Sequence, residues 1–566
     1  MLNRGRYDLM ENLAVGSFCL LLLLGTVLPA MASWAGKARF STQNALWANE
    51  TRIPLVNSAS VSNTIDIDTA TTYQSIDGFG GCFNENGGKA LKAVSSRLAD
   101  SVMKELFDTV SGCKFNLCRM PIGASDFTIS TATLNRWYSL NETVNDTAMN
   151  TITIARDKIY LLPFIKSAMV YRPNLKMWAS PWSPPKWMKV NNDVGAANFI
   201  QTPVMLRAYA RYLTSAVRLF KAEGINLVGL SVQNEPYTNN PYPCCFWSAS
   251  EIRDLIKFYV GPVFDADQVN CEIWSPTMNN GSFTEFNTWL SDQGSARYIK
   301  AVCFQWEGES AVASVHAAYP AMRLYLTETK CGSHENNWAY AENPTFQQMK
   351  WYFDRGANGY MQWNMVLDQT GLSAWGWAQC SMVTVDTTAK TVTFNPQHYC
   401  AKHFSYYVKP GAKKIKTGGT FSNQVGFRNP DGSVVVVANN TGTGALLLGV
   451  RMGAQMMNVQ MPGKSFGTFV FFDSAGVKVS CPISGAGSPG RGSILMTHRS
   501  GAGCVFALHG KNFAGQLVGI DGSVKIPALS SQNGSMVIGT ARLARGMYMV
   551  KGMLDNKYYC STIFLR

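Results

Sequence analysis

The apolar positions between residues 76 and 378 gather into short, β-rich runs, and each run is followed by loop residues and a more helical segment. The helical segment at 203–224, for example, has apolar residues at helical spacing and closes with glycine. The β-rich runs occupy 76–81, 114–123, 175–182, 226–235, 271–277, 298–307, 323–329 and 359–368. Eight strand-then-helix units in roughly 290 residues predict an α/β fold, a (β/α)8 TIM barrel over 76–378.

A different pattern begins at residue 379. Alternating apolar and polar residues, interrupted by Gly, Asn, Asp and Pro, predict an antiparallel β-sandwich domain over 379–478. The segment 33–75 is also strand-like, and we expect it to contribute strands to the same sandwich. A linker rich in Gly, Ser and Pro follows at 479–493, and 494–566 is expected to form a small, basic, β-rich C-terminal domain.

The N-terminus has the pattern of an export signal. Arg4 and Arg6 precede the apolar stretch Leu13 to Leu28, and Ala30 and Ala32 provide the small residues of a cleavage site. We therefore expect a signal peptide over 1–32 and a secreted or cell-surface protein. No later apolar stretch is long enough to predict a stable membrane span.

Composition and charge narrow the possible partners. A chain of 566 residues that is 46% hydrophobic and 12% aromatic is not a disordered one. Its net charge is +14, and residues 481–566 hold nine Lys or Arg against two Asp. With an export signal present, this basic C-terminus favours contact with a cell envelope or secretion machinery over nucleic acid.

The cysteines and histidines give no metal motif. Thirteen cysteines remain after the signal peptide, so some disulfides are expected and at least one thiol stays free. No CxxC and no His-x3-His spacing occurs. We expect no metal and no cofactor.

The candidate catalytic groups are carboxylates at the carboxyl ends of the runs, where a barrel has its open face. Glu235 closes the fourth run and Glu328, 93 residues later, the seventh. Paired carboxyls can cleave a glycosidic bond, one as proton donor and the other as nucleophile or base. Either could instead be a buried ion-pair partner. The other carboxylates at such positions are Glu85, Asp126, Glu307 and Asp368.

Several motifs together resemble glycoside hydrolase family 30, whose best-known members are glucosylceramidases. The motifs are DGFGGCFNE, RMPIGASDFT, WASPWSPPKWMK, SVQNEP, LTETKCG and QWNMVLD, in this order, and the resemblance covers about residues 50 to 475. It implies a barrel with an attached β-sandwich, a retaining mechanism and no metal.

The resemblance also implies roles for individual residues. Glu235 resembles the general acid/base, Glu328 the nucleophile, and Asn234 the residue that contacts the sugar 2-hydroxyl. Substrate-binding or supporting positions are implied for Glu85, Arg119, Trp182, Trp363, Asn364 and Asp126. Arg119 would help to keep Glu328 ionised.

One motif departs from the glucosylceramidases. Where they have His-Trp-Tyr after the sixth strand, this chain has Gln305, Trp306 and Glu307. The change leaves the catalytic pair intact but alters the leaving-group side, where we place Gln305 and Trp306 among the substrate-binding residues.

These observations predict a secreted retaining β-glycosidase, similar to glucosylceramidase, that hydrolyses a β-glucoside, a glycolipid such as a sphingolipid glucoside, or a polysaccharide. Two alternatives stay open. The first is an endo-acting hydrolase of β-1,6-glucan or xylan, and the second is a catalytically silent carbohydrate-binding protein.

Overall fold

The computed structural model describes residues 34–58 and 60–473, together with the backbone of seven strands within 494–565. The chain forms two units, one ending at Ser474 and the other spanning 475–566. The predicted signal peptide at 1–32 and the predicted linker at 479–493 lie outside the described residues.

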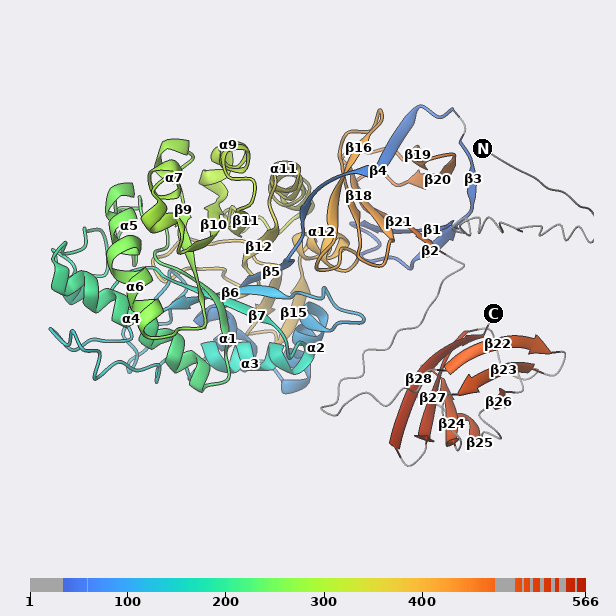
Figure 1. Cartoon of the computed structure of the whole chain (residues 1–566), viewed down its shortest axis with the longest axis horizontal. Coiled ribbons are helices and arrows are strands. Elements are labelled where there is room, and N and C mark those ends of the chain that lie inside the picture. The colour runs from blue at the N-terminus through green and yellow to red at the C-terminus, as the bar shows by residue number, and fades with distance from the viewer. Residues whose placement is uncertain are drawn as a thin grey trace, which may run out of the picture. The chain divides into compact units, whose positions relative to one another are not determined.

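Eight parallel strands close into the predicted barrel (Figure 1). The strands are β5 (Gly78–Cys82), β6 (Leu117–Ile122), β7 (Lys176–Pro181), β8 (Leu227–Ser231), β9 (Glu272–Met278), β10 (Ile299–Gln305), β11 (Arg323–Glu328) and β12 (Gly359–Asn364). Their order around the barrel follows the chain, and β12 pairs with β5 to complete the circle. Each of the eight predicted runs overlaps one of these strands, so the predicted fold class is confirmed.

Helices follow the strands and cover the outside of the barrel (Figure 1). The longest, α4 (Pro203–Ala222), starts where the Thr202 side chain accepts a hydrogen bond from Met205 N, and left-handed Gly224 follows its end. The others are α1 (Glu85–Lys92), α2 (Ser96–Phe107), α3 (Leu161–Tyr171), η1 (Lys186–Met188), α5 (Ala249–Leu255), η2 (Ile256–Val260), α6 (Gly261–Ala266), α7 (Phe283–Leu290), α8 (Gln293–Ala296), η3 (Trp306–Ala311), α9 (Val312–Ala318), α10 (Trp338–Tyr340), η4 (Ala341–Gln347) and α11 (Gln348–Asp354).

Large side chains fill the barrel interior. The rings of Trp178 and Trp274 lie 5.2 Å apart, and Tyr325 lies 4.9 Å from Trp274. Gly229 is required beside them, because a Cβ there would be 2.1 Å from Trp274. The barrel is therefore a packed core, and its chemistry must lie at the strand ends.

The segment 379–412 differs from our expectation. The strands β14 (Val383–Asp386) and β15 (Thr391–Phe394), which we expected in the sandwich, form a small sheet with β13 (Val366–Asp368). Helix α12 (Pro396–Ser405) follows them. The strands of the sandwich resume only at β16, about thirty residues after the predicted boundary.

The sandwich is one ten-stranded sheet built from both sides of the barrel sequence. Its strands are β1 (Trp34–Thr42), β2 (Thr51–Ile53), β3 (Leu55–Asn57), β4 (Asn63–Ser75), β16 (Lys413–Gly418), β17 (Gln424–Arg428), β18 (Val434–Asn440), β19 (Leu446–Met452), β20 (Gln455–Met461) and β21 (Ser465–Asp473). Ile65, Val436, Val450 and Phe469, from four of these strands, meet in one buried cluster. The segment before the barrel thus shares the core of the segment after it.

The C-terminal unit consists of strands in two sheets. A three-stranded sheet contains β22 (Ile494–Ser500), β23 (Gly503–Leu508) and β26 (Ser535–Ile538), and a four-stranded sheet contains β24 (Phe513–Gly519), β25 (Val524–Ser530), β27 (Gly546–Leu554) and β28 (Lys557–Leu565).

Two further expectations concern the whole chain. The ten cysteines between residues 34 and 473 are all free thiols, so the expected disulfides do not form among them. Among the described residues, no helix combines the length and the apolar character that crossing a membrane requires.

Candidate active site

Glu328 is the last residue of β11, and its carboxylate accepts hydrogen bonds from side chains on two other strands. Arg119 on β6 donates from Nη1 to Glu328 Oε2 across 2.5 Å. Gln305, the last residue of β10, donates from Nε2 to the same oxygen across 3.0 Å. Since Arg119 is fully buried, its charge acts on Glu328 with little screening.

Asn234 lies within the same network. Its Oδ1 accepts hydrogen bonds from Arg119 Nη2 at 2.5 Å, from Thr277 Oγ1 at 2.7 Å and from Gln305 Nε2 at 2.8 Å. Three donors on one oxygen fix which way the amide points, so Nδ2 is directed away from them as a donor. Arg119 and Gln305 therefore join Asn234 to Glu328.

Glu235 follows β8 but is not part of it. The strand ends at Ser231, four residues before the expected position, and Glu235 has a left-handed backbone with φ of 43°. Such a conformation is costly for a residue other than glycine and needs support from its surroundings. That support comes from β9, because Glu235 N donates to Thr277 O at 3.1 Å.

The Glu235 carboxylate accepts two hydroxyl hydrogen bonds on Oε2. Thr238 Oγ1 donates across 3.2 Å and Tyr242 OH across 3.3 Å. No Lys or Arg is among these partners, unlike at Glu328. The two carboxyls are thus supported by different chemistry, hydroxyls for one and a guanidinium for the other.

Burial raises the pKa of both carboxyls. The pKa of Glu235 rises to about 8 because the group is buried and because the charges of Glu328 and Glu307 oppose its ionisation. Burial likewise raises the pKa of Glu328, to about 7, while the charge of Arg119 acts in the opposite direction. These contacts indicate that Glu235 has the higher pKa of the two carboxyls and keeps its proton to higher pH.

Aromatic rings surround Arg119 and form one wall of the site. The guanidinium carbon lies 4.3 Å from the ring centre of Trp182 and 5.5 Å from that of Trp363. The two indoles stack on each other at 5.4 Å. Arg119 also donates to Ser180 Oγ, so the wall and the charge are fixed together.

Gln379 connects several of the predicted residues and was not predicted itself. Its Oε1 accepts from Trp363 Nε1 at 2.9 Å and from Asn364 Nδ2 at 3.0 Å. Its Nε2 donates to Asp126 Oδ2 across 3.5 Å. Trp363, Asn364 and Asp126 are thereby brought into one group.

Asp126 is a buried carboxyl beside the pair. Its Oδ1 has no hydrogen-bond partner within the described residues. Burial, together with the charge of Glu235, raises its pKa to about 7. An acceptor without a donor is expensive to bury and is suited to a ligand hydroxyl.

Glu85 and Trp306 lie outside this network. Both oxygens of Glu85 are engaged, Oε1 by Arg156 Nε at 3.0 Å and Oε2 by Arg156 Nη2 and Ile129 N. These contacts make Glu85 part of an ion pair at the start of α1, and the sugar contact that the resemblance implies for it stays a prediction. Trp306 begins η3, and its ring lies 5.7 Å from Lys330 Nζ.

Thr277 and Tyr242 were also missed in the sequence. Thr277 is in the fifth run, one residue before β9 ends, so a search of strand ends for hydroxyls as well as carboxylates would have found it. Tyr242 and Gln379 lie in loops, and no local pattern in the sequence indicates their contacts.

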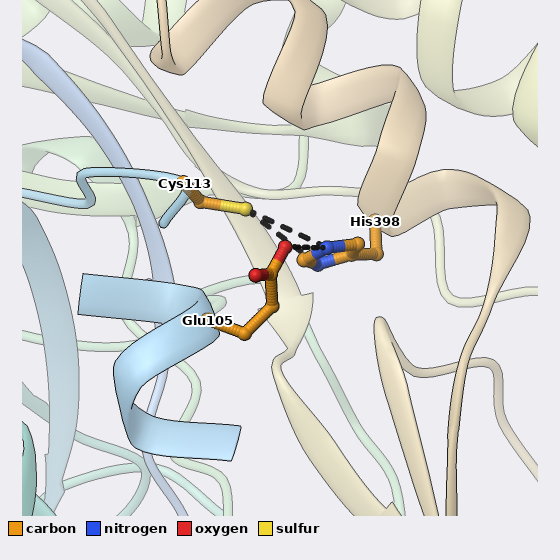
Figure 2. A group of neighbouring side chains, drawn as sticks. All are labelled: Glu105, Cys113 and His398. Carbon is orange, nitrogen blue, oxygen red and sulfur yellow. Dashed lines mark hydrogen bonds and ion pairs between the residues drawn. The ribbon is translucent and has the colours of Figure 1, made fainter. Parts of the chain in front are cut away.

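A second polar cluster lies at the start of β6, the strand end opposite the proposed site. Glu105, Cys113 and His398 bring together a carboxylate, a thiol and an imidazole (Figure 2). His398 Nε2 lies 3.0 Å from Glu105 Oε1, and Cys113 Sγ lies 3.6 Å from His398 Nδ1. These are ligand types that zinc accepts. However, Lys402 already pairs with Glu105, so the carboxylate is neutralised without an ion.

The parallel barrel and the two carboxyls at its strand ends, Glu328 buried and Glu235 partly buried, define the class of protein, a glycoside hydrolase. The glycosyl hydrolase family 30 TIM-barrel domain matches residues 76–408, and the family 30 β-sandwich domain matches residues 411–469. The chain belongs to glycoside hydrolase family 30, as its motifs indicated.

Individual relatives agree with this assignment. Putative glucosylceramidase 1 of Caenorhabditis elegans is 29% identical over 67% of this chain and 76% of its own length. An endo-1,6-β-D-glucanase of Aspergillus fumigatus is 26% identical over 72% of this chain and 87% of its own. The crystal structure of SrfJ from Salmonella typhimurium shares the fold, with a TM-score of 0.72 and 24% identity over 77% of this chain and 99% of SrfJ.

Proposed function

We propose that this glycoside hydrolase cleaves β-glucosidic bonds with retention, using Glu328 as nucleophile and Glu235 as general acid and base. The observation that carries the proposal is the unequal support of the two carboxyls. Arg119 favours an ionised Glu328, whereas Glu235 is partly buried, receives no cationic hydrogen-bond donor and has the higher pKa.

In the first step, a carboxylate oxygen of Glu328 attacks the anomeric carbon, and the bond from that carbon to the leaving oxygen breaks. The proton of Glu235 moves to the leaving oxygen, so that a neutral alcohol departs. The products of this step are a glycosyl ester on Glu328 and an ionised Glu235. Esterification removes the negative charge of Glu328, which lowers the pKa of Glu235, so Glu235 stays ionised and can act as the base in the second step.

In the second step, water attacks the same anomeric carbon from the face that the leaving group vacated. Glu235 takes one proton from the water, the ester bond to Glu328 breaks, and Glu328 departs as a carboxylate. Both side chains return to their initial states, and two inversions give net retention.

Asn234 and Asp126 are proposed to hold the sugar. Asn234 Nδ2, oriented by three hydrogen bonds to Oδ1, would donate to the 2-hydroxyl oxygen. The unpartnered Oδ1 of Asp126 would accept from another hydroxyl. Trp182 and Trp363 would pack against the apolar face of the ring.

Glucose is proposed as the sugar because the names of two kinds of relative share it. One is named a putative glucosylceramidase and the other an endo-1,6-β-D-glucanase, and both names imply a bond to β-linked glucose. Lipid and saccharide leaving groups both remain compatible with the catalytic pair itself. Xylan is a second candidate, supported only by the altered Gln305, Trp306 and Glu307 motif.

The test is mass spectrometry after treatment with a 2-deoxy-2-fluoro β-glucoside. The fluorine slows both formation and breakdown of the glycosyl ester, and a reactive leaving group such as dinitrophenolate on the probe keeps formation fast, so the intermediate accumulates. We expect a labelled peptide that contains Glu328 and no label in Glu328→Gln. A label on another residue, or sugar binding without any hydrolysis, would overturn the proposal and favour a silent carbohydrate-binding protein.

Export of the mature chain is a separate part of the proposal and rests on the sequence at 1–32. Cleavage after Ala32 would leave Ser33 as the new N-terminus, directly before β1. Sequencing the N-terminus of protein recovered from the culture medium tests this. Protein found only inside cells with Met1 retained would contradict it.

A further inference from the structure

Two aromatic side chains stack on each other in the loops beside Glu235. Tyr242, whose hydroxyl donates to Glu235 Oε2, stacks on Trp375 with ring centres 5.1 Å apart and planes 27° apart. Trp375 in turn lies 5.5 Å from Trp377. Tyr242 and Trp375 are both only partly buried. The general acid therefore has a flat aromatic surface as its neighbour.

Two loops bring these rings together. Tyr242 lies between β8 and α5, and Trp375 lies in the loop that follows β13. The second loop is fastened to the proposed sugar site, because Ala374 N donates to Asp126 O at 2.6 Å and Ser373 N donates to Trp377 O. These backbone hydrogen bonds fix the position of the Trp375 loop relative to Asp126.

The wall continues from the sugar site to the general acid. Trp377 packs against the buried cluster that contains Trp182 and Trp363. Trp375 then joins Trp377 to Tyr242. Packed aromatic side chains therefore connect the proposed sugar site with the surroundings of Glu235.

Polar groups border the same surface. Asn240 Nδ2 donates to Tyr242 OH across 2.9 Å, and Asn279 Nδ2 donates to Thr238 Oγ1 across 2.8 Å. Glu307, which the departure from the family pattern places after β10, is exposed. Such a surface suits a sugar ring. The C–H groups of the sugar can pack on the flat aromatic rings, and its hydroxyls can bond to the amides and the carboxylate at the border. An alkyl chain that covered the exposed Glu307 carboxylate would displace its water and offer it no hydrogen bond in return.

We propose that Trp375 and Tyr242 form the subsite for the leaving group and that this leaving group is a saccharide unit, not a lipid. The inference rests on the proposed function, because the leaving oxygen must lie beside Glu235 to receive its proton. The leaving sugar would stack on Trp375, and its hydroxyls would meet Asn240 and Glu307.

The experiment compares two substrates with the same glucose and different leaving groups, a β-1,6-linked glucose disaccharide and octyl β-glucoside. Trp375→Ala, Trp375→Leu and Trp375→Phe are assayed against the unaltered protein. Leucine keeps apolar surface but lacks a flat ring, whereas phenylalanine keeps a flat ring. Trp351→Ala is the control, since Trp351 is an exposed indole on α11 that packs on Arg355.

We expect Trp375→Ala and Trp375→Leu to lower the ratio of kcat/KM for the disaccharide to that for octyl glucoside by about tenfold. Trp375→Phe should restore most of the ratio, and Trp351→Ala should leave it unchanged. An unchanged ratio in Trp375→Leu, or equal losses on both substrates in every Trp375 variant, would overturn the subsite.

Failure of this inference can be told apart from failure of the proposed function. If the fluoro-sugar labels Glu328 but the substrate ratio does not respond to Trp375, only the saccharide subsite is wrong. If Glu328 is not labelled and neither substrate is hydrolysed, the catalytic proposal itself is wrong, and the subsite fails with it.

Discussion

The guanidinium of Arg119 donates to Glu328 Oε2 across 2.5 Å, and its other terminal nitrogen donates to Asn234 Oδ1. One side chain therefore both stabilises the negative charge of the proposed nucleophile and orients the proposed ligand of the 2-hydroxyl. Only a forked cation can do both, because its donors are fixed in one plane.

A substitution of Arg119 that keeps the positive charge tests whether both roles need the forked guanidinium. Arg119→Lys keeps a cation but loses the fork, so we expect kcat/KM to fall by roughly 100-fold. Weaker stabilisation of ionised Glu328 should also raise its pKa, which moves the acidic limb of the pH–rate profile to higher pH. The profile of Arg253→Lys, at a surface pair with Asp254, is the control. An acidic limb that does not move would contradict the role of Arg119.

Glu235→Gln should make the rate depend strongly on the leaving group. A glutamine amide cannot supply the proton, so hydrolysis of an alkyl glucoside should fall on the order of 1,000-fold. A dinitrophenyl glucoside has a leaving group that needs no proton, and formation of the glycosyl ester from it should fall far less. Pre-steady-state release of dinitrophenol measures that step. Equal losses on both substrates would argue against Glu235 as the acid.

The alkaline limb should respond to Thr238. Glu235 must be protonated to act as an acid, so activity is lost as pH rises through its pKa of about 8. The hydrogen bond from Thr238 favours the ionised form and lowers that pKa. Thr238→Val removes the donor, and the alkaline limb of kcat/KM should move up by about half a pH unit. A shift to lower pH would contradict the assignment.

Asp157 should make the protein less stable at high pH. It is buried beside Tyr138, and burial together with the charge of Glu85 raises its pKa to about 7. The folded state therefore holds this proton when the unfolded chain has lost it, and the free energy of unfolding falls as pH rises from about 4 to about 7.

Asp157→Asn removes that dependence while keeping the shape of the side chain. The Tm at pH 8 should rise by about 3 °C or more, and the Tm at pH 4 should change little. Calorimetry at the two pH values measures the difference. If Asp157→Asn changes the Tm at pH 8 no more favourably than it changes the Tm at pH 4, then the pKa of Asp157 is not raised in the folded protein.

The barrel could be predicted from sequence because each strand buries both faces and each unit repeats the same order of elements. The sandwich boundary could not. Alternation of apolar and polar residues marks Val383–Asp386 as a strand, but it does not say which strand lies beside it. Its partner is β13, a three-residue strand directly after the barrel, and three residues give too short a pattern to recognise.

The site residues that could be predicted from sequence are those at strand ends or within the family motifs. Glu328 and Gln305 end strands, and Asn234 and Arg119 lie within quoted motifs. The partners of Glu85 could not be foreseen, because Arg156 lies 71 residues away in a segment without periodicity. Gln379 and Tyr242 depend on how two loops fold back over the barrel.

The pairing of β1 with β21 sets the order in which the enzyme can be completed. Trp34 lies opposite Asp473 and Thr42 opposite Ser465, so one of the first strands made is hydrogen-bonded to one of the last. During synthesis, β1 exposes an unpaired edge until more than four hundred further residues have emerged. A chain that ends before Ser465 would therefore keep one hydrogen-bonding edge of β1 unpaired, and such an edge can pair with another chain and lead to aggregation.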